Sequence, residues 1–95
     1  MKTIFKYQLG FDEKQYVSLP KDAKILTVQA QKNNPCLWAL VDTENEIEKR
    51  RIEIYGTGHK IPNDGMERKY ISTSQMYDGD FVFHVFEYTG FVNSK

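Results

Sequence analysis

One short segment of the sequence has the residue types of an anion-binding loop. It reads Tyr55-Gly56-Thr57-Gly58-His59. Two glycines separated by one residue let the backbone approach a ligand closely, and their N–H groups can form a concave nest beside the Thr57 hydroxyl and the His59 imidazole. Such a nest suits a phosphate group. The segment lacks the Gly-x-Gly-x-x-Gly spacing of a dinucleotide fold, so a second interpretation, in which the glycines only permit a turn, stays open.

One arginine and several aromatic residues could serve this loop or a protein partner. Arg51 opens the segment that ends at the loop, and an outward guanidinium of Arg51 or Arg68 can meet a phosphate or an acidic partner. Trp38, Tyr55 and Tyr70 are candidate interaction residues, because half-exposed aromatic side chains can stack on a base or fill a partner's pocket. The simpler interpretation places these aromatic residues in the core.

Residue spacing indicates neither catalysis nor metal binding. His84 lies in an apolar segment with no serine or cysteine next to it, and Cys36, the only cysteine, is expected to be a small buried thiol. Two histidines far apart in the chain, without a pair of cysteines, do not make a zinc site. We therefore expect no catalytic residue, no metal and no cofactor, and predict that the protein is not an enzyme.

Composition limits the kinds of protein that this chain can be. Its 95 residues predict a single domain over residues 1–95, and 40% hydrophobic residues are enough to form a core. Thirteen basic residues balance thirteen acidic ones, which removes the positive field of a general nucleic-acid binder. Without a disulfide pair, a membrane span or a signal core, the sequence predicts a cytoplasmic protein with no membrane partner.

The elements that must position these residues are strands. Apolar and polar residues alternate with a period of two along most of the chain, and no helical stripe is found. The pattern predicts seven strands, over residues 5–9, 15–19, 25–31, 36–41, 51–55, 70–76 and 81–88. The first two strands are expected to pair with each other. The segments 36–41 and 81–88 are apolar on both faces, so they are expected in sheet interiors.

Polar and turn-forming segments separate the strands. Lys32-Asn33-Asn34-Pro35 is a hairpin signal, residues 42–50 are expected to be an exposed loop, and residues 56–68 show no periodicity. Residues 89–95 are expected to be a frayed end. The fold class that follows is all-β: a small antiparallel, strongly bent sheet, a barrel or a compact sandwich of about seven strands.

A family resemblance rests on four segments of the chain. They read PCLWALVD at residues 35–42, IYGTGH at 54–59, YIST at 70–73 and FHVFE at 83–87. With them, the chain from about Ile4 to Glu87 resembles a family of short, uncharacterised proteins from tailed bacteriophages and prophages. The resemblance implies a phage or prophage origin and the cytoplasm of a bacterial host, and it implies no particular activity.

The sequence leaves three functions open. The first is a non-enzymatic phage accessory protein that binds a bacterial host protein stoichiometrically, for instance to inhibit a host enzyme or a defence system. The alternative is a nucleotide-binding sponge, which sequesters a phosphate-containing signal with Arg51 and residues 56–59. The third is a small hydrolase with His59 or His84 as general base. Open sheet edges could also pair two copies into a homodimer.

Overall fold

The computed structural model describes residues 1–92 of the chain, and the side chains of residues 1–90. Within them it contains seven strands and one turn of 3-10 helix. These are β1 (Lys2–Gln8), β2 (Lys14–Pro20), β3 (Lys24–Gln31), β4 (Asn34–Asp42), β5 (Ile47–Gly56), β6 (Met66–Met76), η1 (Tyr77–Gly79) and β7 (Phe81–Val92). The predicted all-β class is confirmed, and a strand lies at each of the seven expected places.

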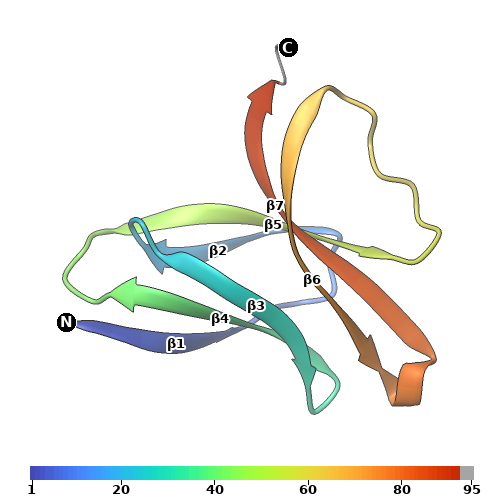
Figure 1. Ribbon diagram of the computed structural model, residues 1–95, viewed down its shortest axis with the longest axis horizontal. Helices are drawn as coiled ribbons and strands as arrows, with labels where there is room; N and C mark the ends of the chain where they lie inside the picture. The colour runs from blue at the N-terminus through green and yellow to red at the C-terminus, as the bar shows by residue number, and fades with distance from the viewer. Residues whose placement is uncertain (93–95) are drawn as a thin grey trace.

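The strands form two antiparallel sheets that pack against each other (Figure 1). One sheet has the order β1-β4-β3 and the other the order β2-β5-β7-β6. The two strands that are apolar on both faces, β4 and β7, lie inside their sheets as predicted. The hairpin between β3 and β4 is also confirmed, because Lys32 and Asn33 both take a positive φ, 51° and 62°, in a tight turn.

The predicted pairing of the first two strands is wrong. β1 pairs with β4, and β2 pairs with β5 in the other sheet. The connection between β1 and β2 is bonded to both sheets, since the Leu9 N–H donates to the Pro35 carbonyl (2.8 Å) and the Glu13 carbonyl accepts from the Ile54 N–H (2.9 Å). Leu9 is therefore buried, and β1 and β2 do not form the hairpin that their short connection suggested.

Three strand ends differ from the prediction by four residues each. β5 begins at Ile47, so residues 47–50 belong to a strand rather than to an exposed loop, because they pair with β2 along its full length. β6 begins at Met66 because it pairs with the far end of β7. The tail prediction is wrong for residues 89–92, which are part of β7, and residues 93–95 lie outside the described part of the chain.

The core lies between the two sheets and draws on both of them. Its members come from the inward positions of the alternating strands. Its most buried apolar side chains are Leu19, Val28, Leu37, Ala39, Ile52, Phe83 and Val85, all with no exposed surface. Cys36 is buried, in agreement with its expected place. The core therefore fixes which face of each strand is left for contact with other molecules.

Side chains close one side of the fold, between β3 and β6. The Ser72 hydroxyl donates to the Val28 carbonyl (2.6 Å) and accepts from the Val28 N–H (3.0 Å). The Ser74 hydroxyl accepts from the Ala30 N–H (3.0 Å). We call these contacts the serine seam. In a closed barrel, β3 and β6 would pair here through backbone hydrogen bonds. Serine side chains make the contact instead, so the two sheets form an open barrel.

Candidate functional site

Three predicted site residues, Arg51, Tyr55 and Tyr70, lie on the outer face of the four-stranded sheet. Ile52 and Ile54 of β5 point into the core, so the residues that alternate with them point outward; these are Arg51, Glu53 and Tyr55. Strand pairing then sets neighbours in rows across the sheet. We call this surface the aromatic face; its rows are Tyr16–Arg51–Tyr88–Arg68, Lys14–Glu53–Phe86–Tyr70 and Tyr55–His84–Thr73.

Glu53 is the centre of the aromatic face and is fully buried although its strand position points outward. Its carboxylate accepts hydrogen bonds from the Tyr55 hydroxyl (2.6 Å), from Arg68 Nε (2.6 Å) and from Arg51 Nε (2.9 Å). Burial by itself would raise the pKa of Glu53, but these hydrogen bonds and charges lower it below its ordinary value. Glu53 is therefore an ionised group that orients its neighbours.

Both arginines of the aromatic face are restrained before any partner arrives. The Arg51 guanidinium lies 4.0 Å from the centre of the Tyr88 ring, and that of Arg68 lies 5.1 Å from it. Arg68 also donates to both oxygens of Asp64 at 3.0 Å, and these bonds lower the pKa of Asp64. Since both side chains already have fixed partners, little rotamer freedom remains to be lost on binding.

Two tyrosines of this face are largely exposed. Tyr16 on β2 is 65% exposed and Tyr70 on β6 is 56% exposed. Tyr70 packs edge-on against Phe86 with ring centres 5.7 Å apart, and Phe86 makes the same contact with Tyr55 at 6.2 Å. The Tyr70 ring thus rests on a packed aromatic layer.

His84 connects the aromatic face to the predicted loop. Its Nε2 is hydrogen-bonded to Thr57 Oγ1 (2.8 Å) and its Nδ1 to Thr73 Oγ1 (3.0 Å). Thr73 Oγ1 also bonds the Tyr70 hydroxyl (2.8 Å). Both ring nitrogens therefore have partners within the chain, and His84 joins three segments of the fold.

The loop that the sequence proposed as an anion nest is folded on itself. The Gly56 N–H donates to His59 Nδ1 (3.2 Å), the Thr57 N–H to the Val82 carbonyl (3.3 Å), and the His59 N–H to the Gly56 carbonyl (3.0 Å). Gly58 has a φ of 86°, which agrees with a turn role. Of the groups assigned to a phosphate, the Gly56 N–H, the Thr57 hydroxyl and His59 Nδ1 thus have partners within the chain, and phosphate binding at this loop stays a prediction.

The other predicted residues are spread over separate parts of the molecule. Arg51 and Gly56 are five positions apart on β5, roughly 16 Å at a strand's rise per residue. Arg51 contacts Glu53 and Tyr88, not the loop. Trp38 is partly buried on β4 of the other sheet, where the register places it between Lys6 and Thr27.

Sequence reasoning named Arg68 as a possible anion-binding residue, but it missed Glu53 and the part that Arg68 and Tyr88 play in covering it. The available signal was an acidic residue between Ile52 and Ile54 in a strand. Nothing in that pattern shows that Arg68 and Tyr88, far along the chain, would cover the carboxylate. Their contribution depends on strand pairing across β5, β7 and β6.

Gly56→Ala tests whether the His59 contact explains this glycine. A Cβ at position 56 would lie 2.8 Å from His59 Cε1, so the ring must move and its bond to the Gly56 N–H weakens. We expect a loss of about 1 kcal/mol in the free energy of unfolding. Denaturant unfolding measures this. Gly10→Ala is the control, because its Cβ would meet only Gln15 Oε1 at 3.9 Å; equal stability of the two variants would contradict the explanation.

The described residues contain neither a cluster of metal ligands nor a membrane-spanning helix. Among residues 1–92, no three His, Cys, Asp or Glu side chains come close enough together to hold a metal ion. In the same part of the chain, no helix has the length and apolar character needed to cross a membrane.

A family model covers nearly the whole chain. The family model of a domain of unknown function, DUF7352, matches residues 1–94. The chain belongs to this family. No significant match to this DUF7352 chain is found among curated proteins or among solved structures. The description of DUF7352 names no activity and no source, so a phage or prophage origin stays a prediction.

Proposed function

We propose that this chain acts by stoichiometric binding to a protein of a bacterial host, and that the aromatic face makes the contact. The observation that carries the proposal is the pair of exposed tyrosines, Tyr16 and Tyr70, on a sheet face whose arginines are already restrained. The bacterial setting is supported by the sequence resemblance, and the mode of action by this surface.

The chemistry of the aromatic face favours a protein partner. Tyrosine and arginine are enriched at the centres of protein interfaces, where they supply large contact areas. Because Arg51 and Arg68 are held by Glu53, the entropy lost on binding is small. The two arginines pair with two acidic groups, Glu53 and Asp64, so these four side chains together have no net charge. A nucleic acid would need uncompensated positive charge to neutralise its phosphates.

The test compares the full chain with a double variant, Tyr16→Ser with Tyr70→Ser, as bait in a bacterial lysate. We expect the unchanged protein to retain one partner in a one-to-one ratio. The double variant should bind the purified partner at least about tenfold more weakly, because two aromatic contacts at the centre of an interface are removed. Quantitative mass spectrometry gives the ratio, and calorimetry gives the affinity.

Tyr77→Ser is the matched control for this test. Tyr77 is 55% exposed, as Tyr70 is, but lies on η1 between β6 and β7 rather than on the aromatic face. We expect it to bind as the unchanged protein does. Wild-type affinity of the double variant would exclude the aromatic face as the contact, and a lysate that yields no stoichiometric partner would count against host-protein binding itself.

A further inference from the structure

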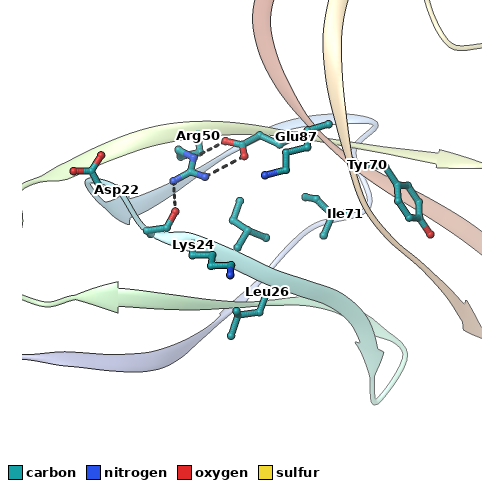
Figure 2. A pocket seen from close by; sticks show the side chains of 10 residues that line it. Asp22, Lys24, Leu26, Arg50, Tyr70, Ile71 and Glu87 are labelled. Carbon is teal, nitrogen blue, oxygen red and sulfur yellow. Dashed lines mark hydrogen bonds and ion pairs between the residues drawn. The ribbon is translucent and has the colours of Figure 1, made fainter.

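A pocket opens between the two sheets where the beginning of β3 parts from β6. Its volume is about 530 Å³, and its walls come from β3, β5, β6 and β7. Figure 2 shows the side chains that line it. This volume is in the range of sites for small organic molecules, which often lie at the mouths of barrels. We call it the inter-sheet pocket.

Arg50 forms a fixed polar group in the inter-sheet pocket. Its Nε and one terminal nitrogen donate to the two carboxylate oxygens of Glu87, the second bond being 3.0 Å long. Its other terminal nitrogen donates to the Ala23 carbonyl (2.8 Å), as the dashed lines in Figure 2 show. Because the pair with Glu87 is bidentate, Arg50 is rigid and its charge is balanced.

Two lysines give the pocket its remaining positive charge. Lys24 lines it from β3 and Lys69 from β6. Among the side chains that the structure describes, neither lysine has a carboxylate within ion-pair distance. Arg50 is balanced by Glu87 and by Glu48, whose carboxylate lies 3.8 Å from it, so Lys24 and Lys69 are the basic lining groups left to meet a ligand. These two lysines therefore favour an anion over a cation at this part of the lining.

Apolar side chains form another part of the lining. Ile25 and Ile71 line the pocket and pack against the buried core, so they offer a fixed apolar surface. Figure 2 shows the ring of Tyr70 pointing away from Arg50 and Glu87, which agrees with its place on the aromatic face. A matching ligand combines an anionic group with a compact apolar or planar body.

We propose that the inter-sheet pocket binds a small organic anion. Its phosphate or carboxylate group meets the ammonium groups of Lys24 and Lys69, and its apolar or planar body rests on Ile25 and Ile71. Arg50, fixed by Glu87, keeps the inner wall polar and rigid. The site shares only Tyr70 with the aromatic face and no residue with the loop at residues 56–59, and the Tyr70 ring points away from Arg50 and Glu87, so anion binding does not depend on the proposed protein binding.

The test is an amide-resolved NMR titration of the full 11.1 kDa chain. The probes are the four common nucleoside 5′-monophosphates, benzoate, inorganic phosphate, and the neutral nucleosides and benzamide. We expect saturable shifts at residues 24–26 and 69–71 with the monophosphates or with benzoate, which tells a phosphate ligand from a carboxylate ligand. The neutral analogues should bind at least tenfold more weakly, and inorganic phosphate less tightly than the organic anion.

Lys24→Gln with Lys69→Gln is the variant that decides the proposal. Both lysines are exposed, so the fold should persist, and affinity for the bound anion should fall at least tenfold. Lys60→Gln, in the exposed loop after β5, should leave affinity unchanged. Protein capture through Tyr16 and Tyr70 should also stay unchanged, which separates this proposal from the proposed function. Absence of saturable shifts with every anion, or equal affinity in the double variant, would overturn it.

Discussion

Glu53→Gln is expected to lower the free energy of unfolding by about 3 kcal/mol. Glutamine fills the same space but leaves the guanidinium groups of Arg51 and Arg68 without the buried anion that now accepts their hydrogen bonds. The lower end of the usual range applies because Arg51 is 24% exposed and Arg68 keeps its bonds to Asp64. Urea unfolding at pH 7 measures the difference.

The free energy of unfolding of Glu53→Gln should also depend less on pH than that of the unchanged protein. The pKa of Glu53 is lowered in the folded state, so its contribution is fully present above the ordinary glutamate pKa, about 4.3. It is lost as the pH falls through the lower folded value. The unchanged protein should therefore lose stability below about pH 4 more steeply than the variant. Glu67→Gln, on the exposed part of β6, should behave as the unchanged protein, and a loss below 1 kcal/mol in Glu53→Gln would contradict the role of the cluster.

The pKa of Tyr55, measured by absorbance, also depends on the Glu53 carboxylate. Burial and the hydrogen bond to the Glu53 carboxylate raise the pKa of Tyr55 to about 12. In Glu53→Gln the negative charge that opposes tyrosinate formation is absent, so Tyr55 should ionise at a lower pH. A spectrophotometric titration thus separates loss of the carboxylate charge from a general loss of stability.

Phe83→Ala is expected to lower the free energy of unfolding by about 3–5 kcal/mol. Phe83 has no exposed surface and stacks on Phe81 with ring centres 5.9 Å apart, so truncation leaves a cavity between the two sheets. For a chain of this length the melting temperature should fall by at least about 12 °C. Calorimetry measures it.

Phe11→Ala is the matched control for the core prediction. Phe11 is 54% exposed in the connection between β1 and β2, and its truncation removes little buried surface. We expect a loss below about 1 kcal/mol. If Phe83→Ala were as stable as Phe11→Ala, the contact between the sheets would not depend on close packing at position 83.

The strands could be predicted from sequence because alternation is a local property. Each of the seven segments carries its own pattern of inward and outward residues, and the pattern survives folding. Pairing is not local: β1 meets β4 rather than β2 because Leu9 and the Pro35 carbonyl hold the connection across the fold. The start of β5 at Ile47 could not be predicted for the same reason. Its first residues are mostly charged, as in a loop, but they pair with β2.

The candidate site could be predicted only in part. Residue type singled out Arg51, Tyr55 and Tyr70, and strand pairing places all three on the aromatic face. The buried state of Glu53 could not be predicted, because an acidic residue at an outward strand position is ordinarily solvated. Its burial depends on Arg68, fifteen residues later and two strands away.

The serine seam also affects whether the edge of β3 can pair with another chain. A free strand edge is a template for another chain, since its unpaired N–H and carbonyl groups can extend the sheet. At β3 the groups of Val28 and the N–H of Ala30 are occupied by hydroxyls, so an incoming strand finds no continuous ladder. The outer strands β1 and β2 instead carry lysines, and β2 ends at Pro20, which disfavours edge-to-edge growth. These features disfavour edge-to-edge pairing in a chain whose described residues are mostly in strands.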